Sequence, residues 1–152
     1  MDPLEGIWRL VDSRGWDESA QAWTAPYGAH PMGQIAFARG RMLAVLCNGD
    51  ADAEICGTRN YSSYGGPYTF DGTTLDTLVD VASDATRIGS HQLRGVVMMG
   101  EQQMLLRPPT RMYGGRVQTR ELIWERRMAR ARIVDRGFFR HPRRTATPPA
   151  EF

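Results

Sequence analysis

Apolar and polar residues alternate over short stretches along most of the chain, and no long stretch shows the period of an amphipathic helix. Between residues 7 and 13, Trp8 and Leu10 share one side of an extended segment, while Ile7 and Val11 share the other. A two-residue period of this kind is typical of β-strands. Comparable segments follow at residues 34–47, 63–84, 90–109 and 117–128. The pattern therefore predicts a protein built from short strands.

Dipeptides that favour tight turns divide these segments into hairpins. Arg39-Gly40, Asp71-Gly72 and Gly100-Glu101 each separate two strand-like runs, and Asp-Gly is a strong signal for a hairpin turn. The result is about eight to nine short strands at nearly regular spacing, which predicts an all-β, antiparallel up-and-down barrel or a sandwich. Ser13–Gly33 is predicted to be a long polar loop over one barrel end, since long loops in compact domains are often functional.

The end of the chain differs from the rest in composition. Residues 126–152 contain eight arginines but only Asp135 and Glu151 as acids, whereas residues 1–125 contain 11 arginines and 15 acids. We expect a barrel domain over residues 1–127 and a basic C-terminal segment over 128–152. Residues 128–139 are compatible with a short C-terminal helix, with Gly137 as its C-cap. The arginines are loosely spaced with few aromatic residues among them, so a solvated tail is favoured over a nucleic-acid-binding one.

Composition narrows the functional classes further. The chain has 152 residues, of which 41% are hydrophobic and 24% charged, as in an ordinary soluble domain. No apolar run approaches the roughly 20 residues of a membrane span, and the N-terminal residues lack the pattern of a secretory signal. We therefore expect a cytoplasmic protein without a membrane partner, in which Cys47 and Cys56 are free thiols.

Several cofactor classes are also disfavoured. All 19 basic residues are arginine, which excludes a lysine Schiff base and a P-loop lysine. His30, His91 and His141 are scattered, and the acids at 50, 52 and 54 lack the calcium-loop pattern. The glycine pair in SYGGPY leads into a strand, so no helix N-terminus follows to hold phosphate. We expect no metal and no cofactor.

Five stretches together resemble the bacterial and fungal lipocalin-like domain family, whose members are calycin-type β-barrels. They are GIWRLVDS, YGAHPMGQIAFARGRMLA, YSSYGGPYTFDG, IGSHQLRGVVMMGEQQMLL and LIWER, and they span about residues 4–127. The resemblance implies a closed barrel in which Gly6 lets the first strand bend and Trp8 fills the closed end. It also implies that Arg126 stacks on the Trp8 ring, which is worth about 0.5–2 kcal/mol.

The chain departs from the family pattern where pocket chemistry would be expected. A His pair common in the family is replaced by Thr77-Leu78, a Trp by Arg87, and a small or acidic residue by His91. The polar groups of the cavity are therefore expected to be rearranged relative to other members.

Two functions remain open from the sequence. A barrel of about eight strands holds one small ligand, so the protein either binds a small hydrophobic or aromatic molecule or converts it as a cofactor-independent isomerase, cyclase or lyase. It would act as a monomer or homodimer. For catalysis we expect His91 to move a proton, because histidine is the side chain type that ordinarily changes protonation near neutral pH. Arg87, Arg94 and Tyr64 would orient the substrate; the alternative is that His91 is an exposed strand-end residue. The expected ligand-binding residues are aromatic or sulfur-containing: Trp16, Trp23, Tyr27, Met42, Tyr68, Phe70 and Met98.

Overall fold

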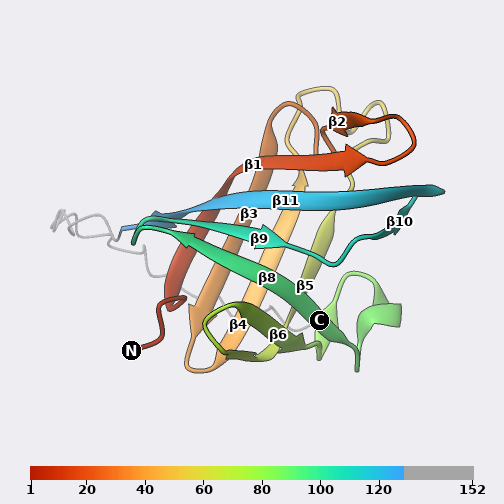
Figure 1. The fold of residues 1–152 in the computed structure, drawn as a ribbon. Helices are drawn as coiled ribbons and strands as arrows, with labels where there is room; N and C mark the ends of the chain where they lie inside the picture. Colours follow the sequence, from red (N-terminus) through yellow and green to blue (C-terminus); the bar gives the residue numbers. More distant parts are fainter. Residues whose placement is uncertain (129–152) are drawn as a thin grey trace, which may run out of the picture.

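A computed structural model describes residues 1–128 and shows a closed antiparallel β-barrel of eight strands (Figure 1). Going around the wall, each strand pairs with the next one in the barrel, which confirms the predicted up-and-down arrangement. The wall strands are β1 (Gly6–Asp17), β3 (Pro31–Ala38), β4 (Arg41–Asn48), β5 (Ser62–Phe70), β6 (Thr74–Leu78), β8 (His91–Met99), β9 (Gln103–Arg107) and β11 (Arg116–Arg127).

Three short strands and one 3₁₀ turn are added to this wall. β2 (Ala22–Thr24) pairs with β1, β7 (Val81–Ala82) pairs with β5, and β10 (Arg111–Tyr113) pairs with β11. The 3₁₀ turn η1 (Ala85–Arg87) lies between β7 and β8. β2 and β10 lie away from the N-terminus, towards the other end of the barrel (Figure 1).

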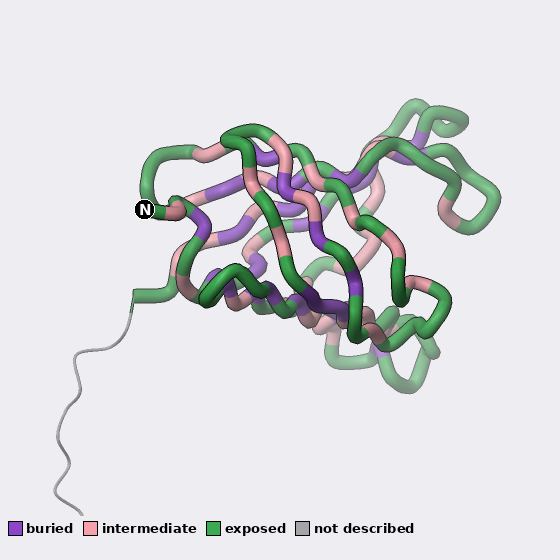
Figure 2. Tube along the Cα trace, turned by 90° about the horizontal axis from the view of Figure 1, so that it is seen from below, coloured by how far each residue is buried: buried purple, intermediate pink, exposed green. Residues whose placement is uncertain are grey.

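The barrel closes where β1 pairs with β11, from Ile7 opposite Arg127 to Asp17 opposite Gln118. The register shifts by one residue between Leu10 and Asp12. Such a bulge exchanges the residues that face inward, and accordingly Leu10 is buried before the shift and Ser13 after it. Buried positions recur at every second residue in β3, β6 and β9, whereas β4 and β5 each contain three consecutive buried residues. Figure 2 shows the buried segments distributed along the wall of the barrel.

The predicted hairpin turns are confirmed. Arg39 and Gly40 have φ values of 52° and 74° between β3 and β4, the positive pair that a type I′ turn requires. Between β5 and β6, the Asp71 carboxylate accepts hydrogen bonds from the backbone N–H groups of Thr73 and Thr74 at 2.9 and 2.7 Å. The polar side chain thus holds the turn by satisfying local backbone donors.

Trp8 fills one end of the barrel, as the resemblance implied. Its side chain is 0% exposed and its Nε1 donates a hydrogen bond to the Leu4 carbonyl at 2.8 Å. The Arg126 guanidinium carbon lies 4.2 Å from the centre of the indole ring. Leu4, Phe37 and the other inward-facing apolar residues complete a single core.

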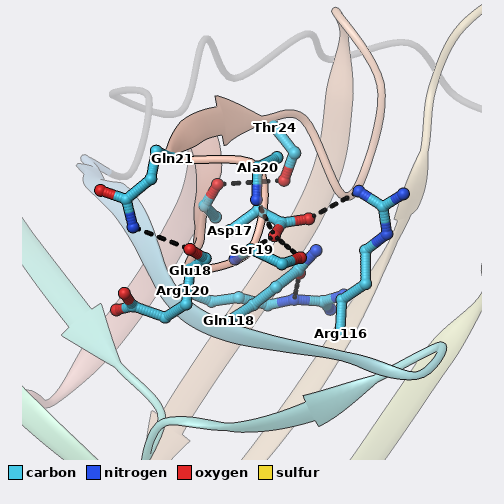
Figure 3. A network of polar contacts seen from close by, with 10 residues as sticks. Asp17, Glu18, Ser19, Ala20, Gln21, Thr24, Arg116, Gln118 and Arg120 are labelled. Atoms are coloured by element: carbon cyan, nitrogen blue, oxygen red, sulfur yellow. Dashed lines mark hydrogen bonds and ion pairs between the residues drawn. The ribbon is translucent and has the colours of Figure 1, made fainter.

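The segment Ser13–Gly33 is not the single loop that the sequence predicted. β1 continues to Asp17, and β2 pairs back onto it. The buried Asp17 carboxylate organises the connection, because it accepts hydrogen bonds from the Ser19 and Ala20 backbone N–H groups and from Arg116 (Figure 3). These bonds, that of Ala20 foremost, hold the pKa of Asp17 well below its usual value.

Cys47 is buried, Cys56 is exposed, and both are free. Within residues 1–128 there is no helix with the length and hydrophobicity needed to cross a membrane. The expected C-terminal helix over 128–139 and the basic tail lie outside the described residues, apart from Met128.

Candidate functional site: a cavity lined by arginine and tyrosine

A cavity of about 70 Å³ lies inside the barrel. One part of its wall is apolar and comes from inward-facing positions of four strands: Ile35 (β3), Leu46 (β4), Leu106 (β9), and Leu122 and Trp124 (β11). The other part is polar, with three tyrosines and four arginines: Tyr27, Tyr64, Tyr113, Arg87, Arg94, Arg111 and Arg120. The cavity therefore offers an apolar surface beside a cationic one.

Strand alternation explains how arginines reach the interior. Arg94 lies on β8 two residues before the buried Val96, and Arg120 lies on β11 two residues before Leu122. Residues two apart on a strand face the same side. Both guanidinium groups thus point to the side of the wall that carries the core.

One arginine–tyrosine group forms around Tyr64. Arg87 lies over the Tyr64 ring with 4.2 Å between guanidinium carbon and ring centre, and Arg94 lies 5.7 Å from the same centre. Arg87 also donates hydrogen bonds to Ser62 Oγ at 3.2 Å and to Gln92 Oε1 at 3.0 Å. The turn η1 that carries Arg87 is capped by Asp84, which accepts a hydrogen bond from the Thr86 N–H.

A second group forms around Tyr113 on β10. The guanidinium carbon of Arg120 lies 3.5 Å from the centre of the Tyr113 ring, and that of Arg111 lies 4.7 Å from it. Arg120 Nε donates a hydrogen bond to Gln118 Oε1 at 3.3 Å. β10 thus brings an aromatic ring over the end of the barrel and stacks it on an arginine of the wall.

Burial shifts the protonation equilibria of this cluster. Desolvation lowers the pKa values of Arg87 and Arg120, and neighbouring arginines lower both further. Desolvation raises the pKa of Tyr27. Arginine nevertheless stays protonated in proteins, and a tyrosine with a raised pKa keeps its proton at neutral pH. The site consequently presents hydrogen-bond donors and positive charge.

Among the residues expected from sequence, the structure brings Arg87, Arg94, Tyr64 and Tyr27 to the cavity wall. His91 lies apart from them on the outer face of β8, where its Nδ1 is 2.9 Å from Asp76 Oδ1. Its role in proton transfer stays a prediction that this position does not favour.

The remaining expected ligand-binding residues do not line the cavity. Trp16 and Trp23 pack edge to face at 5.4 Å, with Arg14 over the Trp23 ring, on the β1–β2 extension. The others belong to the core or pack against it: Met42, Tyr68, Phe70 and Met98.

Sequence reasoning did not select Arg111, Tyr113 or Arg120. Arg120 had a usable signal, because it shares its strand face with Leu122 and Trp124. Arg111 and Tyr113 lie in a three-residue strand that follows a proline pair. Such a short segment has no hydrophobic periodicity from which a strand could be predicted.

Comparison with known families agrees with this geometry. A family model described as a lipocalin-like domain matches residues 5–127. The chain therefore belongs to the lipocalin-like domain family, as the five sequence stretches suggested. No curated protein matches the chain significantly in sequence.

Proposed function

We propose that this barrel binds one small, largely apolar, ring-bearing molecule in the cavity between the tyrosines and Trp124. The observation that carries the proposal is the mixed wall of the cavity. Aliphatic side chains and an indole offer an apolar surface, and tyrosines offer aromatic faces with a polar group. Apolar pockets with a few convergent polar groups are the usual sites for small ligands.

The chemistry of the wall favours binding over conversion of the ligand. The described residues that line the cavity include no His, Asp, Glu or Cys, the side chains that most often transfer protons or attack substrates. Tyr27 has a raised pKa, so it is a poor base at neutral pH. An isomerase, cyclase or lyase at this site would depend on tyrosine, arginine and the Ser62 hydroxyl.

Nuclear magnetic resonance can test the proposal through Trp124, whose side chain belongs to the cavity wall and whose indole N–H gives a separate signal. Titration with benzamide or benzoate is expected to shift the Trp124 indole N–H signal to saturation. The signal of Trp23, 50% exposed and outside the cavity wall, should stay unchanged.

A matched pair of variants locates the binding. Ala44 is buried in the cavity wall and Ala38 is exposed near the end of β3. Ala44→Leu should fill the cavity and abolish the shift, at about 1–3 kcal/mol of lost stability from overpacking, whereas Ala38→Leu should bind as the wild type does. The proposal fails if neither probe shifts Trp124, or if Ala44→Leu binds both unchanged.

A further inference from the structure

The four arginines of the cavity wall have no carboxylate partner within residues 1–128. The same part of the chain makes six arginine–carboxylate ion pairs, and none of them involves Arg87, Arg94, Arg111 or Arg120. Asp84 lies three residues before Arg87, but its carboxylate accepts hydrogen bonds from Thr86 instead. Within the described residues, four positive charges are therefore gathered at one site without a carboxylate in an ion pair with any of them.

The acids of the barrel wall near this end are already engaged. Glu121 follows Arg120 on β11 but faces the other side of the strand, where it pairs with Arg14 at 2.8 Å and Arg107 at 2.7 Å. Asp17 pairs with Arg116 at 3.0 Å. Neither carboxylate can neutralise an arginine of the cavity wall without breaking its own ion pair.

Stacking on tyrosine leaves the donor edges of these guanidinium groups available. A guanidinium group carries its five N–H donors in its own plane, so contact with an aromatic ring occupies its face and not its edge. Arg120 donates one hydrogen bond from Nε, and the Arg111 side chain donates none within the described residues. Arg87 and Arg94 donate only to neutral oxygens, those of Ser62, Gln92 and Leu93.

A partly buried group of like charges is unfavourable until an anion neutralises it. Arg87 and Arg94 lie 4.2 and 5.7 Å from the centre of the same Tyr64 ring, so their like charges are close together. Burial of Arg87, together with Arg94 and Arg111, lowers its pKa. A carboxylate offers two oxygens that match the fork of an arginine. The apolar wall beside the cluster, with Leu122 and Trp124, would then hold the body of the same molecule.

Trp124 adds a buried aromatic surface to the wall beside the cluster, because it is 1% exposed and lines the cavity.

We infer that the ligand is a ring-bearing carboxylate, whose anionic group is held by Arg87, Arg94, Arg111 and Arg120 and whose ring lies against Trp124. This inference rests on the proposed function and adds the chemical class of the ligand. Tyr27 and Tyr64 contribute further donors and aromatic contact at the same site.

The test compares two probes of nearly equal shape, benzoate and benzamide, by titration of the Trp124 indole signal. Wild-type protein should bind benzoate at least about tenfold more tightly than benzamide, as expected for charge-assisted hydrogen bonds. The benzoate affinity should fall as sodium chloride is raised from about 0.05 to about 0.5 M. Benzamide binding should not respond to salt.

Variants then assign the effect to the cluster. Arg87→Met and Arg120→Met should each weaken benzoate binding about tenfold and so reduce the preference of the protein for benzoate over benzamide. Arg9→Met is the matched control, because Arg9 is exposed on β1 and paired with Glu125, and it should change neither affinity. If one cavity variant does not fold, the other variant and the comparison of the two probes on wild-type protein still test the inference.

The outcomes separate the two claims. Equal binding of benzamide and benzoate overturns the inference and leaves the proposed function standing. Undiminished benzoate binding in both cavity variants also overturns it. Absence of binding by either probe contradicts the proposed function, and the inference with it.

Discussion

Arg126 joins three separate parts of the chain at the closed end of the barrel. Besides covering the Trp8 ring, it donates hydrogen bonds to the carbonyl groups of Pro3 at 2.6 Å, Glu5, and Glu101 at 3.0 Å. Gly6, with φ of 124°, lies directly beneath the guanidinium, and a Cβ there would lie 3.2 Å from Nη1. The glycine thus permits both the bend of the strand and the close approach of the arginine.

Removal of the Trp8 side chain should be among the most damaging changes to the core. Trp8→Ala is expected to lower the free energy of unfolding by about 3–5 kcal/mol, because the cavity left behind collapses only in part. Urea denaturation measures the effect. Trp23→Ala, at a half-exposed position, should cost less than about 1.5 kcal/mol. Similar losses in the two variants would contradict the assignment of Trp8 as the plug.

Substitution by alanine is expected to affect stability very differently at two strand glycines. At Gly66 on β5 a Cβ would lie 1.9 Å from the Leu78 carbonyl oxygen, whereas at Gly95 on β8 the nearest atom would be 3.7 Å away. Gly66→Ala should therefore destabilise the protein by more than about 2 kcal/mol, since backbone must move. Gly95→Ala should be within about 1 kcal/mol of neutral. Equal thermal stability of the two variants would refute this difference.

At the scale of elements, the β1–β2 connection depends on the ionised form of Asp17. Its pKa is depressed in the folded state, so its stabilising contribution is present above the unfolded pKa of about 3.9. That contribution is lost as the pH falls from there through the depressed folded value. Asp17→Asn should be less stable than wild type at pH 7, and the difference should shrink below about pH 4.

The measurement is the free energy of unfolding of both proteins at several pH values between 7 and 3. Asn keeps the shape of the side chain but cannot titrate or pair with Arg116 as an anion. A stability difference that stays constant down to pH 3 would show that Asp17 acts through shape and not through charge.

Elements that are held by hydrogen bonds among neighbouring residues of the chain were predictable from sequence. Elements that depend on pairing with a distant strand were not. Asp71-Gly72 fixes its hairpin by local hydrogen bonds and by glycine's freedom. The extension of β1 to Asp17 depends instead on β2 and β11 as partners. A bulge just before the extension, between Leu10 and Asp12, breaks the two-residue period, and the polar residues that follow therefore indicated a loop.

The same distinction applies to the site. Arg94 and Arg120 follow from strand alternation once a buried neighbour on the same strand is known. Arg87 does not, because it lies on the turn η1 and its direction depends on contacts with Ser62 and Tyr64. That these arginines form no ion pair with a carboxylate among residues 1–128 follows from three-dimensional packing. It cannot be read from the number of charges along the chain.

For the whole molecule, closure of the sheet gives the wall strands more hydrogen-bonded neighbours than the added strands β2 and β10 have. β1 and β11 each pair along much of their length, whereas β2 and β10 each pair with a single neighbour over three residues. Strands with fewer partners open at lower free energy. Backbone amides of β11 around Leu122 should exchange hydrogen as slowly as those of β4, and amides of β2 and β10 should exchange much faster.

Hydrogen exchange followed by nuclear magnetic resonance measures these protections residue by residue. The central amides of β4 pair on both sides, with β3 and β5, and give the internal reference. Faster exchange at the β1–β11 seam than in β4 would show that the barrel opens at this seam before it unfolds.

The contact between Arg126 and Trp8 also fixes when the barrel can be completed during synthesis. The two residues belong to the last and first strands, and Arg126 binds the Glu5 carbonyl 121 residues earlier in the chain. On the ribosome, β1 therefore waits for β11, although β3 can pair with it much sooner. Contacts of such sequence separation slow folding. Until Arg126 has been synthesised, the barrel cannot close and Trp8 lacks the arginine that covers it.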